Sequence, residues 1–275
     1  MTHKRKQMSL KVFVGVLLAV FGFATFFPFL WMIFSSLKTN AEINQLVPTL
    51  LPKQATLDNF KELFVRMNFD VYLRNTLIVT ACSFIGMIFN AMAGYGFSKF
   101  DFKGRNGLFL LVLATMMIPG QVTMIPVYLL LNSVGLTNTL VGIVLPGLVN
   151  AFGIFLFRQF MGNISDEMLE AARLDGASEW YIFWKLILPL SRPVLAVQGI
   201  LTFIGGWNSF LWPLIIANDE KYYTLSVGLQ LLQGQHGSDY GLQMAGATFM
   251  VIPVLIIFMI FQKYILSGFN VSGMK

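Results

Sequence analysis

Charged residues are scarce in this chain of 275 residues. Asp, Glu, Lys and Arg make up 12% of it, and 56% of the residues are hydrophobic, whereas a soluble domain has about 25% charged residues. A water-soluble fold of this length has too little polar surface to cover that much apolar side chain, but lipid can surround it. The shortage of charge therefore excludes an ordinary soluble domain and predicts several membrane-spanning segments.

Cysteine and histidine are also rare. Cys82 is the single cysteine, and the two histidines, His3 and His236, are far apart in the sequence. One cysteine excludes an internal disulfide and a cysteine-based zinc site, so we expect no bound metal. The net charge of +6 comes from short basic tracts between apolar runs rather than from a basic face, so we expect no nucleic-acid partner.

Six apolar stretches are long enough to cross about 30 Å of hydrocarbon as helices. The first follows a basic N-terminal tract, but it exceeds the about 7 to 15 apolar residues of a cleaved signal sequence, so we expect it to remain as a span. The fold class predicted is therefore an all-α polytopic membrane protein with six transmembrane helices. The stretches are residues 12–37, 71–98, 108–131, 139–157, 193–217 and 244–262.

Lys and Arg are divided unequally between alternate connections. Thirteen of the 19 lie in one set, which includes both termini and the connection 158–192, and six lie in the other set. Because basic residues are retained on the cytoplasmic side, both termini are predicted to be cytoplasmic. The predicted organisation is an N-terminus over 1–11, a membrane domain over 12–264 and a tail over 265–275. The segments 38–70 and 218–243 are expected to lie outside, the former as an external cap.

The predicted spans contain no ionisable residue well inside an apolar run. Ion-coupled carriers usually place one near the middle of the membrane, so this class is disfavoured, although polar side chains and backbone oxygens can also bind sodium. A Walker A sequence is absent as well. The stretch from Gly94 to Lys99 lacks its spacing and is better explained by close helix packing. The chain is therefore predicted to be either passive or driven by a partner.

The connection 158–192 is far longer than adjacent helices need. Ser165 followed by two acids is typical of a helix N-terminus, and Gly176 suits a left-handed helix end. One stripe of this first short helix is expected to carry Met168, Ala171, Ala172 and Asp175.

A second short helix is expected from Ser178 until Pro189 interrupts it, with one aromatic face at the membrane boundary. That face comprises Trp180, Phe183, Trp184 and Ile187. The pair suggests a docking device, and the alternative is simply a well-capped amphipathic helix pair.

The sequence EAARLDGASEWYIFWKLILPL within this connection resembles the EAA loop of binding-protein-dependent ABC importer permeases. The family pattern is EAA, three residues, Gly, nine residues, Ile, any residue, Leu-Pro. Leu186 stands where Ile is usual, which is a conservative departure. The segments GYGFSKFDFKGR, IPVYLLL and GGWNSFLWPL are similar to the carbohydrate-uptake branch with maltose-permease-like six-span subunits. The matching residues are Glu170, Ala171, Ala172, Gly176, Leu188 and Pro189.

This resemblance implies a type I importer permease with a cytoplasmic coupling helix-turn-helix, located in a bacterial or archaeal cytoplasmic membrane. The implied partners are a second permease, two ATPase subunits and an extracytoplasmic solute-binding protein, and the implied substrate is a mono- or oligosaccharide. ATP and magnesium would be bound by the ATPase, so this chain would bind no cofactor and catalyse no reaction. The residues implied in ATPase coupling are Glu170, Ala171, Ala172, Asp175, Gly176 and Pro189.

Aromatic and hydrogen-bonding side chains in the fifth stretch suit a sugar path. They are Trp207, Asn208, Ser209 and Trp212. Alternatively, Trp212 belongs to an interfacial aromatic belt and Asn208 bonds a neighbouring helix. Asn90, Gln121 and Asn150 are similar polar candidates.

Two further features leave alternatives open. Six prolines within or near the apolar runs suggest kinks or hinges, or only static distortion, namely Pro28, Pro119, Pro126, Pro146, Pro213 and Pro253. The polar stretch 233–240 either contacts a binding protein or is an ordinary surface loop. The competing functions are an ion-coupled or passive sugar carrier and a membrane scaffold without transport activity, neither of which explains the EAA pattern.

Overall fold

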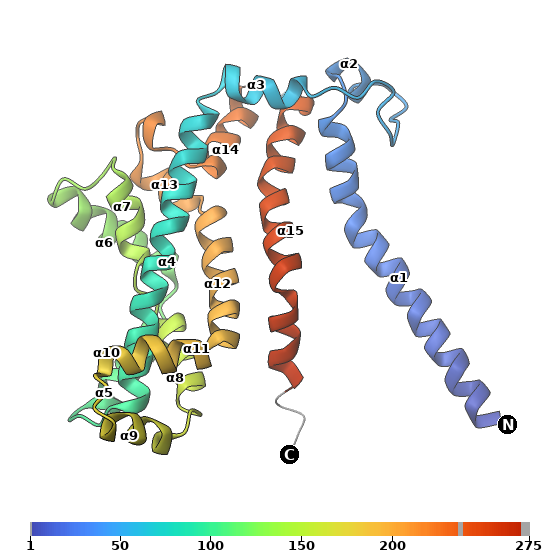
Figure 1. Cartoon of the computed structure of the whole chain (residues 1–275). Helices are drawn as coiled ribbons and strands as arrows, with labels where there is room; N and C mark the ends of the chain where they lie inside the picture. Colours follow the sequence, from blue (N-terminus) through green and yellow to red (C-terminus); the bar gives the residue numbers. More distant parts are fainter. Residues whose placement is uncertain (1, 236–238, 271–275) are drawn as a thin grey trace. The chain divides into compact units, whose positions relative to one another are not determined.

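A computed structural model describes residues 2–235 and 239–270, and within these ranges every regular element is helical (Figure 1). The chain divides into two compact units, which we describe separately. Unit 1 comprises Met1–Met67 and Leu229–Ile252, and unit 2 comprises Asn68–Gly228 and Pro253–Lys275. Helices α14 (Leu225–Gln235) and α15 (Tyr240–Asn270) contribute residues to both.

Unit 1 contains α1 (Thr2–Ser36), α2 (Asn40–Ile43) and α3 (Asp58–Arg66). The amide of Asn59 donates hydrogen bonds to the backbone oxygens of Ser36 at 2.8 Å and Lys38 at 2.7 Å, so α3 satisfies carbonyls at the end of α1. The Glu42 carboxylate accepts from the Lys53 amide at 2.9 Å. The segment 38–70, which we predicted to be an external cap, is therefore internally hydrogen-bonded, while its side of the membrane stays a prediction.

In unit 2, α4 (Phe69–Lys99) packs chiefly against α8 (Ala151–Met161) and α12 (Arg192–Trp207). A glycine on the side of α4 that faces α8 lets the two helices approach closely. A Cβ added at Gly94 would lie 2.5 Å from the Cβ of Phe157 and 2.9 Å from the backbone nitrogen of Arg158, whereas one at Gly96 would meet open space. The prediction of close helix packing for the stretch from Gly94 to Lys99 is therefore confirmed at Gly94 and not at Gly96.

We had expected the apolar stretches 108–131 and 139–157 each to form one helix, but each of them is broken into two bent parts. Helices α5 (Arg105–Thr115) and α6 (Gly120–Ser133) meet at 99°, and α7 (Leu140–Val144) with η1 (Leu145–Gly147) meets α8 at 42°. Pro119 precedes α6 with an extended ψ of 129°, and Pro146 lies in η1. Each proline lacks the N–H that would continue the preceding helix.

Within residues 2–235 and 239–270, four segments are long and apolar enough to cross a membrane, and up to six exist if each bent pair is one span. The remaining four of the six prolines named in the sequence lie within helices: Pro28 in α1, Pro126 in α6, Pro213 in α13 (Leu211–Ile216) and Pro253 in α15. The four segments are Leu10–Ser36, Phe69–Lys99, Arg192–Ile216 and Tyr240–Gln262.

The segment 218–243 is more regular than the loop we predicted. It contains η3 (Glu220–Tyr222), all of α14 and the first residues of α15. Residues 236–238 of the predicted polar tip lie outside the described residues.

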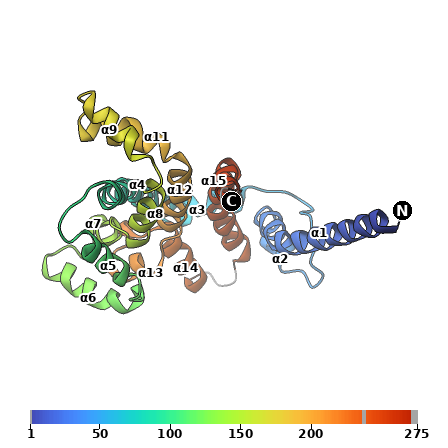
Figure 2. The same cartoon turned by 90° about the horizontal axis from the view of Figure 1, so that it is seen from below.

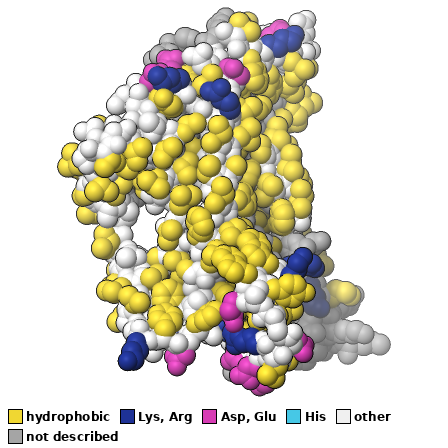
Figure 3. Space-filling model, turned by 60° about the vertical axis from the view of Figure 1, so that its left-hand side comes forward, with side chains coloured by type: hydrophobic (Ala, Val, Ile, Leu, Met, Phe, Trp, Pro, Cys, Tyr) yellow, Lys and Arg dark blue, Asp and Glu magenta, His cyan; other side chains and the backbone are white. Residues whose placement is uncertain are grey.

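The remaining helices of unit 2 form the connection that the sequence singled out. Figure 2 shows α9 (Asp166–Leu174) and α11 (Leu188–Leu190) extending to one side of α4, α8 and α12. On the face drawn in Figure 3, hydrophobic side chains cover the middle, and Lys, Arg, Asp and Glu gather toward the two ends. An apolar band between two charged ends is typical of a surface that faces lipid between two aqueous layers.

Candidate functional site

The connection 158–192 has the two short helices that its capping residues predict. The Ser165 hydroxyl accepts a hydrogen bond from the Met168 amide at 3.4 Å, and Ser178 does the same for the Tyr181 amide at 3.3 Å at the start of α10 (Glu179–Ile182). Gly176, between the helices, has a φ of +81°, which a residue with a Cβ rarely adopts. The N-cap at Ser165, the start of a second helix near Ser178 and the glycine turn are therefore confirmed.

Pro189 does not interrupt the second helix, and this prediction is wrong. A π-helical turn, η2 (Phe183–Ile187), follows α10 and leads directly into α11, in which Pro189 occupies the first turn. The π turn shifts the hydrogen-bond register, so the missing proline N–H falls where a new helical segment begins. The chain leaves the helical path only at Ser191, with ψ at 11°.

The predicted aromatic face of the second helix is divided in two. Phe183 and Ile187 are buried in unit 2, whereas Trp180 is 62% exposed and Trp184 is 47% exposed. The buried pair belongs to an apolar cluster with Phe157 of α8. Packing against this cluster selects which side of the helix faces inward, and the two tryptophans form a separate exposed face.

Helix α9 likewise has one buried side and one exposed side. Leu169 is 1% exposed and, together with Met168 and Ala172, packs into the same apolar cluster. The predicted stripe is therefore split, because Met168 and Ala172 face inward while Ala171 and Asp175 are exposed. Glu170 and Gly176 are exposed as well. Sequence reasoning missed Leu174, which is 89% exposed four residues after Glu170.

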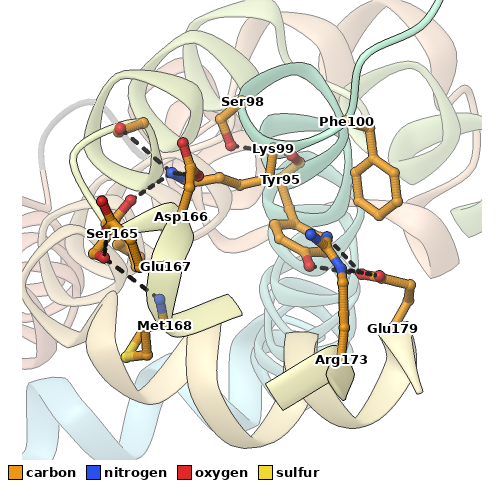
Figure 4. Close-up of polar contacts among 12 residues, drawn as sticks. Tyr95, Ser98, Lys99, Phe100, Ser165, Asp166, Glu167, Met168, Arg173 and Glu179 are labelled. Carbon is orange, nitrogen blue, oxygen red and sulfur yellow. Dashed lines mark hydrogen bonds and ion pairs between the residues drawn. The ribbon is translucent and has the colours of Figure 1, made fainter. Parts of the chain in front are cut away.

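A polar group joins this segment to α4 (Figure 4). The Tyr95 hydroxyl donates a hydrogen bond to Glu179 Oε2 at 2.9 Å, and Arg173 Nε donates to Glu179 Oε1 at 2.7 Å. The hydrogen bond from Arg173 holds the pKa of the Glu179 carboxyl below its ordinary value, and the same bond raises the pKa of Arg173.

A second polar contact lies one helical turn further along α4. Lys99 Nζ is 2.6 Å from Asp166 Oδ1 and also donates hydrogen bonds to the backbone oxygens of Gly162 and Ile164. The Lys99 side chain is only 2% exposed. A buried ammonium needs such partners, so Lys99 ties the end of α4 to the start of α9.

Unit 2 also contains a cavity of about 580 Å³, bounded by parts of α4, α6, the α7–α8 bend and α12. Its lining contains amides, hydroxyls and apolar side chains but no Asp, Glu, Lys, Arg or His. The polar side chains that line it are Ser83, Asn90, Thr123, Asn150, Gln198, Thr202, Ser209 and Trp212.

The structure divides the predicted sugar-path residues. Ser209 and Trp212 line the cavity, and Trp212 Nε1 donates a hydrogen bond to the Gly142 backbone oxygen at 3.1 Å. Trp207 is 3% exposed and its ring stacks on Phe203 at 5.7 Å, while Asn208 is exposed; neither lines the cavity.

Among the other polar candidates, Asn90 and Asn150 line the cavity, and Gln121 does not. Asn90 Oδ1 accepts a hydrogen bond from the backbone N–H of Asn150 at 3.0 Å. Gln198 was missed. It is 6% exposed, and its Oε1 has no hydrogen-bond partner in the part of the chain described. An amide side chain ten residues before Asn208 in the apolar run 193–217 was the available signal.

The comparisons with known proteins agree with this architecture. Residues 83–270 match the family described as binding-protein-dependent transport system inner membrane component. The chain belongs to this family, as the EAA pattern indicated, and it is a transport subunit with the predicted type I importer permease fold.

The chain matches permeases over nearly their whole length. The chain is 36% identical to the arabinooligosaccharides transport system permease protein AraQ of Halalkalibacterium halodurans, over 94% of each chain. It is 30% identical to the lactose transport system permease protein LacG of Rhizobium radiobacter, over 98% of this chain and 97% of that protein. A chain in the crystal structure of a bacterial ABC transporter involved in the import of the acidic polysaccharide alginate superposes with a TM-score of 0.85 at 27% identity, covering 94% of this chain and 98% of that one.

Proposed function

We propose that this chain is one of two transmembrane subunits of an ATP-driven importer for a mono- or oligosaccharide. The relatives named for arabinooligosaccharides and lactose support the carbohydrate class. The cavity in unit 2 supports it as well, because amide and hydroxyl groups beside an aromatic ring suit sugar hydroxyls and ring faces.

The single observation that carries the energy source is the two-sided character of α9. Leu169 anchors the helix in the apolar cluster, while Glu170, Ala171, Leu174 and Asp175 stay exposed to solvent. An anchored helix with a small residue and an apolar residue on its outer side suits a docking contact with another protein. We assign this face, with the Gly176 turn, to the partner ATPase, and Pro189 to the helix that supports it.

In this proposal, the second permease completes the path, two ATPase subunits bind ATP and magnesium, and an extracytoplasmic binding protein delivers the sugar. A solved alginate transporter with a similar fold contains a periplasmic protein bound to an alginate pentasaccharide, which supports such a partner. This chain binds no nucleotide or metal itself. It lies in the cytoplasmic membrane with both termini and α9 on the ATPase side.

The test is charge reversal on the docking face. Glu170→Arg and Gly176→Leu should leave membrane insertion intact but release the ATPase during purification and abolish sugar uptake into proteoliposomes. Asp101→Arg is the matched control, because Asp101 has an exposed side chain on the α4–α5 connection and should leave both measurements unchanged. Normal uptake by Glu170→Arg, or uptake that survives ATP depletion, would favour a passive or ion-coupled carrier instead.

The side of the membrane can be measured directly. In a Cys82→Ser background, a Leu174→Cys variant should react with a membrane-impermeant maleimide in inside-out vesicles stripped of the ATPase and remain unlabelled in intact cells. Labelling of intact cells would place α9 outside and contradict the proposal.

A further inference from the structure

A single carboxylate connects three helices at the base of unit 2. Glu179, in the first turn of α10, accepts a hydrogen bond from Tyr95 of α4 and two from Arg173 at the end of α9, the weaker at 3.5 Å from Nη2. Figure 4 shows the Tyr95 and Arg173 side chains converging on the Glu179 carboxylate. Because both carboxylate oxygens are used, the position of α10 relative to α4 and α9 is fixed in direction as well as distance.

The surroundings of Tyr95 make this contact unusual. Tyr95 is 5% exposed, and its ring packs against Phe100 at 5.2 Å and Phe183 at 5.7 Å. Apolar packing alone would hold the two segments together without a hydroxyl. A buried hydroxyl that bonds a carboxylate adds a preferred orientation, which apolar contact does not supply.

The opposite end of α9 is held by the same helix. Tyr95 and Lys99 are four residues apart, so they lie on one side of α4. Lys99 holds Asp166, the first residue of α9, and Tyr95 reaches Arg173 near its last residue through Glu179. The end of α4 therefore contacts α9 at both ends, across about 12 Å of helix.

Helix α4 also reaches the cavity. It is continuous from Phe69 to Lys99, and its residues Val79, Ser83 and Asn90 line the cavity. Asn90 is about 14 Å along the helix from Lys99 at 1.5 Å per residue. A displacement of α9 that α4 follows would thus move side chains of the cavity wall directly.

We propose that Tyr95, Lys99, Arg173 and Glu179, which we name the clasp, are positioning residues that make α9 and α4 move as one body. The clasp rests on the proposed function, because it transmits the movement of a docked ATPase. It does not form the docking face. Loss of the clasp should separate ATP hydrolysis from sugar movement while the ATPase stays bound.

The principal experiment measures sugar uptake per ATP hydrolysed by the whole complex, with its binding protein, in proteoliposomes. Tyr95→Phe keeps the ring contacts and removes only the hydroxyl, and Glu179→Ala removes the shared carboxylate. We expect uptake per ATP to fall about fivefold or more in Glu179→Ala and by a smaller factor in Tyr95→Phe, with ATPase recovery unchanged. The exchange variant Arg173→Glu with Glu179→Arg should recover part of the ratio that either single change loses.

Three outcomes would contradict the clasp. An unchanged ratio in both Tyr95→Phe and Glu179→Ala, or an exchange variant no better than its single changes, would overturn the clasp. Release of the ATPase by Glu179→Ala would also overturn it, because the residue would then belong to docking. Glu170→Arg separates the two proposals: if that variant retains its ATPase and its uptake, the proposed function fails rather than the clasp.

A distance measurement covers variants that fold poorly or transport nothing. Spin labels at Asp101→Cys and Asp175→Cys, in a Cys82→Ser background, report the separation between the end of α4 and the end of α9. The wild-type clasp should give one narrow distance distribution that is the same with and without ATP. Tyr95→Phe should broaden it, and a distribution equally narrow in Tyr95→Phe would contradict the proposal.

Discussion

The α9–α11 segment and the cavity of unit 2 differ in how completely their polar groups are paired within the chain. In the segment, the serine caps are occupied, and the Arg173–Glu179 and Lys99–Asp166 pairs are formed within the chain. In the cavity, Gln198 Oε1 has no partner among the described residues. Buried polar atoms are nearly always satisfied in proteins. The segment is therefore built to keep one arrangement, whereas the cavity retains a group that water or a solute hydroxyl can satisfy in turn.

The largest expected effect comes from breaking the buried side of the segment. Leu169→Ala removes a fully buried side chain from the apolar cluster and should lower the free energy of unfolding by about 2 to 5 kcal/mol, measured by circular dichroism in mixed micelles. Leu174→Ala is the matched control on the exposed side of the same helix. It should change stability by less than about 0.5 kcal/mol while weakening ATPase recovery. Equal stability losses would mean that α9 does not have two distinct sides.

The contact between α4 and α8 can be broken by a substitution in α4. Gly94→Val would place atoms against Phe157 and the Arg158 backbone, and overpacking of this kind should cost about 1 to 3 kcal/mol. The unfolding temperature in detergent is the measurement. Gly96→Val, in open space on the same helix, should be tolerated. If both variants melt alike, the close approach of α4 and α8 is not a stabilising contact.

A substitution in the cavity should raise the stability of the protein, whereas the two preceding substitutions lower it. Gln198→Leu removes a buried carbonyl oxygen that has no partner among the described residues, so it should raise the free energy of unfolding by about 1 kcal/mol. It should also raise the sugar concentration needed for half-maximal uptake, because a hydrogen-bonding group is lost. Gln121→Leu, exposed and outside the lining, should change neither quantity. A destabilised Gln198→Leu protein with normal uptake would show that Gln198 only packs.

The smallest expected effect is the acid response of Glu179. Its pKa lies below the ordinary value of 4.5 because Arg173 and Tyr95 donate hydrogen bonds to the carboxylate. The stabilisation is therefore complete above pH 4.5 and is lost as the pH falls through the lowered pKa. The Glu179 side chain is 42% exposed, so solvent screening keeps this contribution below about 1 kcal/mol. Unfolding temperatures of the wild type and Glu179→Gln should differ less at pH 3 than at pH 6, and a constant difference would contradict this.

Local signals in the sequence predicted local structure well. The caps at Ser165 and Ser178 and the turn at Gly176 depend on the chemistry of single residues, so they could be read directly. Prolines were less informative, because Pro119 lies at a 99° break while Pro126, seven residues later, lies inside a helix. The difference depends on what each helix packs against, which a single sequence does not reveal.

The parts that were missed depend on distant residues. Tyr95 and Glu179 are 84 positions apart, and neither has a neighbour in sequence that indicates their contact. The split of the aromatic face arises in the same way, because the apolar cluster that buries Phe183 includes residues of α4 and α8. Ser209 and Trp212 line the cavity while Trp207 and Asn208 do not, and the helical path is interrupted between them, from Asn208 until α13 begins at Leu211.

The neutral lining of the cavity affects which solutes it accepts. A carboxylate or phosphate that entered would lose its hydration shell without meeting a cation among the lining side chains, and such desolvation costs several kcal/mol per ion. A hydroxyl would only exchange one hydrogen bond for another. Competition between a neutral sugar and its uronic acid in the uptake assay would measure the difference, and equal competition would contradict it. Under the proposed function, the wall formed by this subunit would therefore sort solutes by ionic state before it sorts them by size or ring geometry.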